Sequence, residues 1–185
     1  MWYSQARRMP VKRSDCFMTT GMARPQRYIL HIADGRSAAG NVAHWETIGN
    51  TSTHFSIEKD GTIVQHVDTD HIAKGMGTGN SGAIQAEHIG FSGDALTDGQ
   101  LASTSQLLAW LHFTYNVPIR LSGGPGIAGV GYHRQYLDPI KDKDNPKAHW
   151  HCPGTPVIVA IPIILDRARA LIEDGSVYFL AAGNR

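Results

Sequence analysis

The sequence predicts an α/β fold, a single domain in which a mixed central β-sheet is flanked by helices. Short strand-like runs alternate with two stretches of helical periodicity, residues 99–116 and 162–174. A hairpin signal at residues 53–67 adds an antiparallel pair to a sheet that is otherwise linked through helices. The chain of 185 residues is 42% hydrophobic, which suffices for one ordinary core but hardly for two.

The first ordered part of the chain is predicted to form a strand, then a helix and then a β-hairpin. Residues 28–33 are a short apolar run, typical of a buried strand. Ser37 can cap a helix that extends to Ile48 and ends at a Gly-Asn pair. Residues 53–58 and 62–67 alternate between apolar and polar and are joined by Lys-Asp-Gly, a strong local signal for a β-hairpin.

The next part begins with a glycine-rich loop at residues 75–82. No Lys-Ser/Thr pair follows it, which argues against a phosphate-binding P-loop. Residues 83–90 form another predicted strand. Thr97 or Asp98 can cap the helix over 99–116.

The last part is predicted to contain a brief strand at residues 119–121 and then a long loop to Gly154. Pro162 opens the second helix, and Gly175 closes it. Gly and Pro residues punctuate the loop, so it is a poor candidate for a hydrophobic core of its own.

Residues 1–27 differ from the rest of the chain. They lack a hydrophobic period and carry six basic side chains against one acidic side chain, whereas the remainder has eleven basic and fifteen acidic ones. We expect a basic arm over 1–27, mobile or loosely docked, followed by one domain over 28–185. Such an arm could contact a polyanion.

Composition excludes several classes of protein. The body is acidic and its aromatic residues are not interleaved with basic ones, which argues against nucleic-acid binding. No apolar run reaches the roughly 18 residues of a membrane span, and we expect no signal peptide because the N-terminus is polar and charged. Two cysteines are too few for a disulfide framework.

Metal-binding residue types gather in the long loop, at His133, His149, His151 and Cys152, while His31 lies in the first predicted strand. A histidine in an apolar strand is more often a hydrogen-bonded core residue than a ligand. However, a loop that folded over this strand could add His133 and Cys152. Two imidazoles and one thiolate would leave the fourth position of a tetrahedral Zn²⁺ open, as in catalytic sites.

A hydrolytic zinc site also needs a proton acceptor. Glu87 is the obvious one, because it lies in a strand that is otherwise apolar or uncharged. The alternative is an edge strand with the carboxylate in water. His149 and His151 could be solvent-exposed loop residues, alternative ligands or donors to an oxyanion.

Five segments in a fixed order carry a family resemblance. They are Ile29-Leu30-His31, residues 52–65, residues 80–87, Gly131-Tyr132-His133 and Cys152-Pro153-Gly154. Together they resemble the zinc-dependent N-acetylmuramoyl-L-alanine amidases, the type-2 amidase fold shared by phage endolysins and peptidoglycan recognition proteins. The resemblance covers about residues 28–174.

The resemblance implies hydrolysis of the amide between N-acetylmuramic acid and L-alanine of the peptidoglycan stem peptide. It implies one Zn²⁺ held by His31, His133 and Cys152, with Glu87 as the general base. Thr53 stands where many members have tyrosine, and Trp150 where active members often have lysine or threonine. The oxyanion helper is therefore open, and its candidates are His149, His151, Lys147 and Tyr132.

The gap between His133 and Cys152 is longer than in compact members, which predicts an insertion around residues 138–147. The leading hypothesis is a phage or prophage endolysin that stays in the host cytoplasm until lysis and whose basic arm contacts an anionic cell-wall polymer. The alternatives are a cytosolic muropeptide-recycling amidase and a non-catalytic recognition module. The presence of Cys152 favours catalysis, because recognition modules commonly lack the third ligand.

Overall fold

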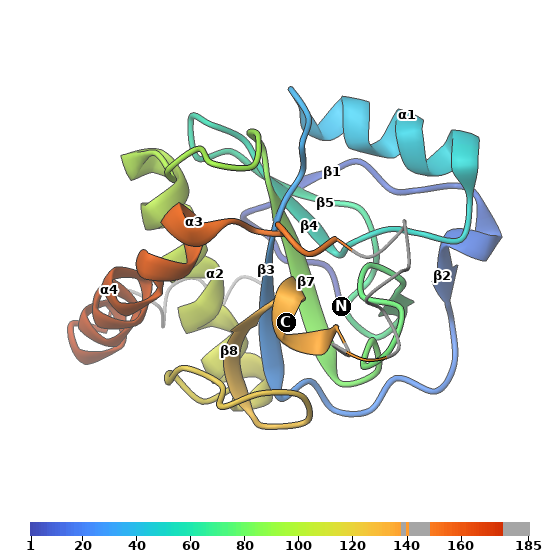
Figure 1. Cartoon of the computed structure of the whole chain (residues 1–185). Helices are drawn as coiled ribbons and strands as arrows, with labels where there is room; N and C mark the ends of the chain where they lie inside the picture. The colour runs from blue at the N-terminus through green and yellow to red at the C-terminus, as the bar shows by residue number, and fades with distance from the viewer. Residues whose placement is uncertain (138–139, 141–148, 176–185) are drawn as a thin grey trace.

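The computed structural model describes residues 1–137, 140 and 149–175. A six-stranded mixed sheet forms its centre (Figure 1). In spatial order the strands are β1 (Arg7–Arg8), β5 (Ile63–Gln65), β4 (Phe55–Ile57), β7 (Ala83–His88), β3 (Arg27–Ile32) and β8 (Gly129–Tyr132). Only β4 and β5 pair antiparallel, as the hairpin signal predicts, and the other neighbours are parallel.

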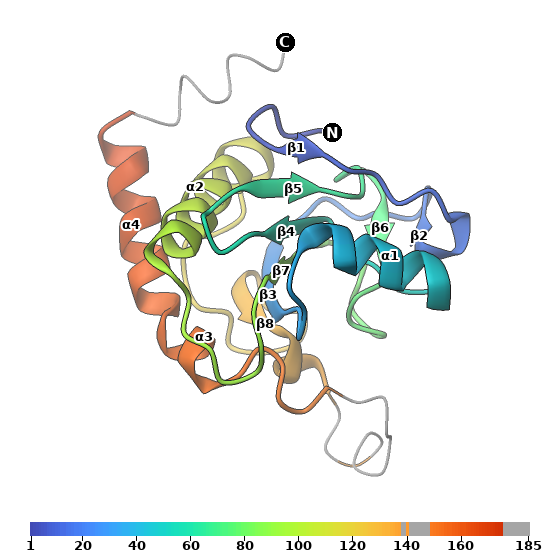
Figure 2. The same ribbon diagram turned by 90° about the horizontal axis from the view of Figure 1, so that it is seen from above.

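Helices cover both faces of the sheet. Figure 2 shows α1 (Ala38–Ile48) on one face, and α2 (Asp98–Tyr115) and α4 (Ile161–Glu173) on the other. The predicted single α/β domain with a mixed, helix-flanked sheet is therefore confirmed. A short helix, α3 (Thr155–Val159), leads into α4, and a 3-10 helix, η2 (His133–Tyr136), follows β8.

Local signals set the helix ends. The Thr97 hydroxyl accepts a hydrogen bond from the Gln100 amide while the Gln100 side chain accepts one from the Thr97 amide, a capping box that starts α2. Asn116 ends α2 in the left-handed conformation, with φ of 63°. Ser37 caps α1 through the Gly40 amide, as the sequence predicts.

The hydrophobic core lies between the sheet and the α2–α4 pair. Tyr28 and Leu30 of β3 and Ile84 and Ala86 of β7 face it, and all four are fully buried. Because side chains alternate along a strand, His31 and Glu87 project from the opposite face. Core packing thus determines the face on which these two polar side chains stand.

The structure corrects the expectation for residues 1–27, which are packed against the domain. β1 pairs with the edge strand β5, and β2 (Phe17–Met18) pairs with β6 (Ile72–Ala73) in a separate two-stranded sheet. Tyr3 is fully buried, its ring centroid 4.6 Å from that of Trp110. These apolar residues show no period because each occupies a separate site along an extended path.

Two other expectations fail between α2 and α3. Residues 119–121 do not form a strand, and Leu121 makes one isolated bridge to Val130. That partner belongs to β8, a strand within the stretch predicted to be a loop, because Gly129 and Gly131 dilute its apolar pattern. The predicted insertion at 138–147 lies outside the described residues, apart from Ile140. In the described part of the chain, no helix has the length and apolarity needed to span a membrane.

Candidate metal centre and active site

Parallel strand pairing brings His31 and His133 together. In the register of β3 with β8, Leu30 faces Tyr132, so the next residue of each strand, His31 and His133, continues the pairing at the point where β8 ends. Their ring centroids are 4.7 Å apart. Both side chains are buried, with 1% of His31 and 6% of His133 exposed.

Cys152 reaches the same place from the long loop. Its carbonyl accepts a hydrogen bond of 3.1 Å from the Arg134 amide of η2, and its Sγ accepts one of 3.4 Å from the Ile32 amide of β3. Sγ lies 3.8 Å from Nδ1 of His31. One ligand atom from each of His31, His133 and Cys152 lies within 4.8 Å of the other two.

This donor set fits a zinc ion. Zn–N bonds of about 2.0 Å and Zn–S bonds of about 2.3 Å place tetrahedral ligands roughly 3.3–3.8 Å apart, close to the spacing found here. Nδ1 of His31 is the ring nitrogen that faces Cys152 Sγ. Imidazole nitrogen and thiolate sulfur are donors that Zn²⁺ prefers in proteins, so the chemistry of the donor set fits this metal.

The protonation states also suit a metal site. Burial lowers the pKa of His31, and it lowers the pKa of His133 to about 4, so both imidazoles are neutral at pH 7 and able to donate a lone pair. Burial and the neighbouring Glu87 raise the pKa of the Cys152 thiol. A cation beside the sulfur favours the thiolate, so metal binding would release a proton.

Glu87 stands opposite His31 in the β3–β7 register. Its Oε2 is buried and has no hydrogen-bond partner among the described residues. Burial, followed by the charge of Asp34, raises its pKa to about 8. The alternative of an edge strand with the carboxylate in water is wrong, because β7 lies between β4 and β3. Such a carboxyl can exchange a proton near neutral pH.

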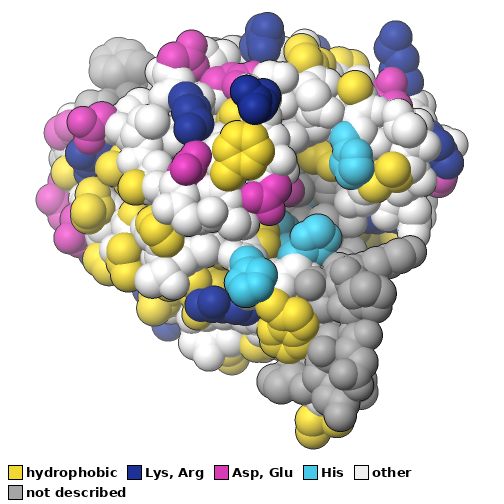
Figure 3. All heavy atoms as spheres, turned by 45° about the horizontal axis from the view of Figure 1, so that its top comes forward, with side chains coloured by type: hydrophobic (Ala, Val, Ile, Leu, Met, Phe, Trp, Pro, Cys, Tyr) yellow, Lys and Arg dark blue, Asp and Glu magenta, His cyan; other side chains and the backbone are white. Residues whose placement is uncertain are grey.

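A cleft with a cavity of about 160 Å³ contains these groups. We call it the active-site cleft. It is lined by His31, Ile32, Ala33, Asp34, His44, Trp45, Ile48, Thr51, Thr53, Gly75, Glu87, His133, His149 and Cys152. Figure 3 shows the face on which several histidine side chains gather around a hollow. The cleft therefore joins residues from β3, β7, α1 and the long loop.

The candidate helper residues differ in position. His149 lines the cleft, and its ring centroid is 5.6 Å from that of His133. His151 is exposed and does not line the cleft. Tyr132 shares the face of Leu30 and packs against the hydrophobic core, so it is not brought to the site. Lys147 lies outside the described residues.

Sequence reasoning missed Asp34. Its carboxylate accepts hydrogen bonds of 2.6 Å and 3.1 Å from the amide and hydroxyl of Ser92, and it lines the cleft. The residue has a φ of 46°, a conformation that costs about 1 kcal/mol or more outside glycine. Asp34 directly follows the first predicted strand, and this position was the signal in the sequence that could have identified it.

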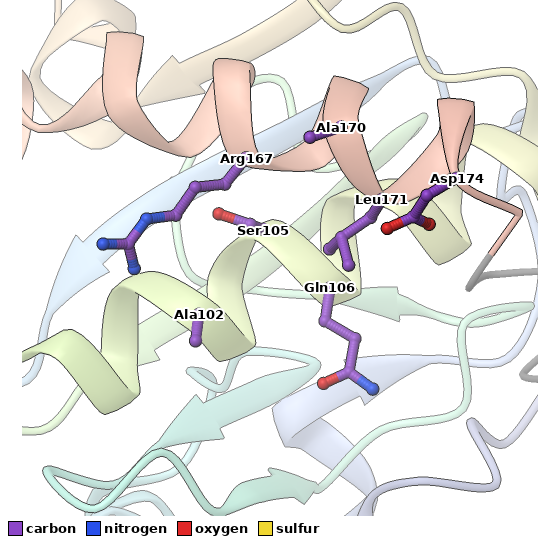
Figure 4. Close-up of a pocket in the computed structure, with 7 residues that line it drawn as sticks. All are labelled: Ala102, Ser105, Gln106, Arg167, Ala170, Leu171 and Asp174. Carbon is purple, nitrogen blue, oxygen red and sulfur yellow. The ribbon is translucent and has the colours of Figure 1, made fainter.

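A larger cavity lies elsewhere, between α2 and α4 (Figure 4). It measures about 490 Å³, and its lining combines the aliphatic residues Ala102, Ala170 and Leu171 with polar ones, with Arg167 and Asp174 at opposite ends. It contains none of the metal-binding cluster. Size alone is thus a poor guide to the reactive centre, which is smaller and richer in buried polar groups.

Comparisons with known proteins agree with this geometry. A family model described as N-acetylmuramoyl-L-alanine amidase matches residues 21–154. AmpD, solved as a selenomethionine derivative, is similar in structure with a TM-score of 0.62 and 22% identity, over 92% of this chain and 96% of that one. No protein of curated function matches the sequence.

Two further solved structures have the same fold. LysC, an N-acetylmuramoyl-L-alanine amidase from Clostridium intestinale URNW, has a TM-score of 0.58 and 19% identity, over 86% of this chain and 97% of that one. AmiA, a hydrolase from Staphylococcus aureus solved with its ligand, has a TM-score of 0.68 and 14% identity, over 95% and 87%. At these identities the likeness establishes the fold.

Proposed function

Because the chain belongs to the N-acetylmuramoyl-L-alanine amidase family, we propose that it hydrolyses the amide between N-acetylmuramic acid and L-alanine in peptidoglycan, as a zinc enzyme. The observation that carries the proposal is the convergence of His31, His133, Cys152 and Glu87 in one cleft. A recognition module needs only to bind the stem peptide. It has no need for a buried proton acceptor beside a set of three metal ligands.

We assign one Zn²⁺ to the site formed by His31, His133 and Cys152. These three ligands would leave one coordination position for substrate or water. When bound, Zn²⁺ supplies Lewis acidity, which polarises a carbonyl and lowers the pKa of water. The two imidazoles supply neutral donors, and the thiolate offsets part of the metal charge. Burial of all three side chains keeps bulk water from competing for the site.

Glu87 is assigned as the general base and acid. A carboxylate with a pKa near 8 accepts the proton of the attacking water and then donates it to the amine of L-alanine as the C–N bond breaks. The acyl carbon gains the hydroxyl and the amine gains the hydrogen, so one water is consumed for each bond cleaved. His149 lines the cleft beside His133 and is assigned as a donor to the developing oxyanion.

The exposed cations of the N-terminal segment favour action on the cell wall over action on a small soluble muropeptide. Arg7, Arg8 and Lys12 are all exposed, and they can attract an anionic wall polymer. We therefore place the protein with the phage or prophage endolysins, released from the host cytoplasm at lysis. A cytosolic recycling amidase is the second candidate, and its support is the structural likeness to AmpD.

The decisive experiment compares wild-type protein with Glu87→Gln on purified peptidoglycan sacculi and on soluble muropeptides. We expect wild-type protein to release new N-terminal alanine and Glu87→Gln to be slower by at least about 100-fold. Zinc content and sedimentation with sacculi should be unchanged. Glu173→Gln, an exposed carboxylate in the last turn of α4, is the matched control.

The outcomes separate the candidates. Zinc-loaded wild-type protein that sediments with sacculi but releases no alanine would be a recognition module. Faster cleavage of soluble muropeptides than of sacculi would support recycling. Release from sacculi that a chelator abolishes and added zinc restores would support the endolysin.

A further inference from the structure

A second groove adjoins the active-site cleft. Its cavity measures about 460 Å³, and it lies between the N-terminal segment and the glycine-rich loop. Met18 of β2, Asn50 and Lys74 form one side, while Asn80 and Ser81 belong to the loop. We call it the Lys74 groove. It brings together the two sequence features that the metal centre does not use, the basic N-terminal segment and the glycine-rich loop.

The groove and the cleft share a wall. Asn50 and Lys74 line the groove, and the residues that follow them, Thr51 and Gly75, line the active-site cleft. The groove and the cleft therefore adjoin along residues 50–51 and 74–75. A chain-like substrate held in the cleft would have to pass over these residues to reach the groove.

Lys74 is the cation of this groove. Its Nζ donates hydrogen bonds of 2.9 Å to the Asp15 carbonyl and 3.1 Å to Oδ1 of Asn50, which are both neutral acceptors. An ammonium group has three N–H donors, so one remains. Within the part of the chain that the structure describes, no carboxylate lies within ion-pair distance of Lys74. The Asp15 carboxylate is engaged by the Arg13 guanidinium, at 2.7 Å.

The walls of the groove are held in place before any ligand binds. Oδ1 of Asn80 accepts hydrogen bonds from the Met76 amide and from Gln85 Nε2, each at 3.0 Å. Ser81 Oγ donates to the Gly21 carbonyl at 2.8 Å and accepts from the Ala23 amide at 3.0 Å. A preformed site loses less entropy on binding.

Building on the proposed function, we propose that the Lys74 groove binds the stem peptide and that Lys74 pairs with its first free carboxylate beyond the scissile amide. The two arms of the substrate differ in charge. The lactyl carboxyl of the sugar arm is consumed in the amide, whereas the peptide arm carries the α-carboxylate of a γ-linked D-glutamate directly after L-alanine. A half-buried cation without an acidic partner selects the anionic arm. Lys74 is thus a specificity residue and takes no part in bond cleavage.

The test uses the zinc-loaded protein and two soluble substrates. One is N-acetylmuramoyl-L-alanyl-γ-D-glutamyl-L-lysine, and the other carries an amide in place of the D-glutamyl α-carboxyl. Wild-type protein should cleave the acid with a KM about tenfold lower than that of the amide. Lys74→Gln should raise the KM of the acid to that of the amide, with kcat within about twofold for both. Lys74→Arg should keep the preference, and Lys59→Gln, an exposed cation outside the groove, should not change it.

Binding provides a second readout, because loss of two hydrogen bonds in Lys74→Gln could loosen the fold. Titration of wild-type protein with the tripeptide L-alanyl-γ-D-glutamyl-L-lysine should show tighter binding than titration with its amidated form, and added salt should reduce the difference. Equal KM values and equal binding of the two forms by wild-type protein would overturn the inference while the amidase function stands. Failure to cleave either substrate would overturn the amidase function instead.

Discussion

The Sγ atom of Cys152 lies 3.8 Å from Nδ1 of His31, although 121 positions separate the two residues in sequence. His31 is fixed by the centre of the sheet, whereas Cys152 is held by the loop after η2. The contact closes the metal centre over the end of β3. The loop thus brings one candidate ligand to a site that is otherwise built on strands.

The first prediction concerns this third ligand. Cys152→Ala should lose bound zinc, because two imidazoles alone form an incomplete site, whereas Cys152→Asp should retain it through a carboxylate oxygen. Metal content after dialysis, measured by inductively coupled plasma mass spectrometry, checks this. Cys16→Ala removes the other buried cysteine, which is not part of the metal-binding cluster and does not line the cleft, and should retain one zinc per chain. Full zinc occupancy in Cys152→Ala would mean that another residue is the ligand.

The second prediction separates two histidines that stand two positions apart. His149→Ala should lower kcat by roughly 10- to 100-fold, as expected for the loss of one oxyanion donor, and leave zinc content unchanged. His151→Ala should change kcat by less than about twofold, because this exposed side chain does not line the cleft. Steady-state kinetics on a soluble muropeptide decides between them. Equal effects of the two substitutions would argue against the assignment of His149.

The third prediction concerns stability at acidic pH. His66 is buried, with Nδ1–H donating to the Met9 carbonyl at 2.9 Å and Nε2 2.9 Å from Ser56 Oγ. Burial lowers its pKa to about 4, whereas an unfolded histidine titrates near 6.5. Between these values the unfolded state binds more protons, so the free energy of unfolding falls as the pH drops from 6.5 to 4. The loss from His66 is about 3 kcal/mol.

Urea unfolding at a series of pH values measures this loss. His66→Gln should be less stable at pH 7, because it disrupts the contacts with Met9 and Ser56, and should lose less stability between pH 6.5 and 4. His54 and His88 are also buried, with pKa values lowered to about 4, and they contribute in the same window in both proteins. The difference between the two slopes therefore reports His66. An unchanged slope in the variant would refute the assignment.

The fourth prediction divides the N-terminal segment into a structural and a charged part. Tyr3→Ala should reduce the free energy of unfolding by about 3–5 kcal/mol, because it removes a fully buried ring that packs on Trp110. The double variant Arg7→Gln/Arg8→Gln should change stability by less than about 1 kcal/mol and weaken sedimentation with sacculi in a salt-dependent way. Thermal unfolding and sedimentation at two salt concentrations check both. If wild-type protein bound sacculi equally at both salt concentrations, the charges of Arg7 and Arg8 would have no role in that binding.

Periodicity made much of the fold predictable. The apolar run around His31 and the apolar or uncharged run around Glu87 indicate two interior strands of the sheet, and capping residues such as Thr97 mark the helix ends. His133 and Cys152 were singled out by residue type, because a histidine and a cysteine in a loop are typical metal ligands. These residues come close to His31 because β3 and β8 pair in parallel. Such pairing between distant strands produces no local pattern in the sequence.

The remaining features depend on single residues with distant partners. Tyr3 packs against Trp110, and Asp34 accepts hydrogen bonds from Ser92. In both pairs the partner is distant in the sequence. Neither interaction produces a repeating pattern. The same holds for Lys74: it lines a cavity, and among the described residues no carboxylate lies within ion-pair distance of it.

The two-residue strand β1 has a consequence for self-association. It covers β5 and becomes the outermost strand on that side, and it consists only of Arg7 and Arg8, both exposed. An open sheet edge is a template onto which another chain can add. Here a second copy that paired at this edge would bring arginine side chains of the two copies next to each other on the faces of the sheet. Like-charge repulsion at the sheet margin should therefore oppose fibre growth when the protein accumulates to high concentration.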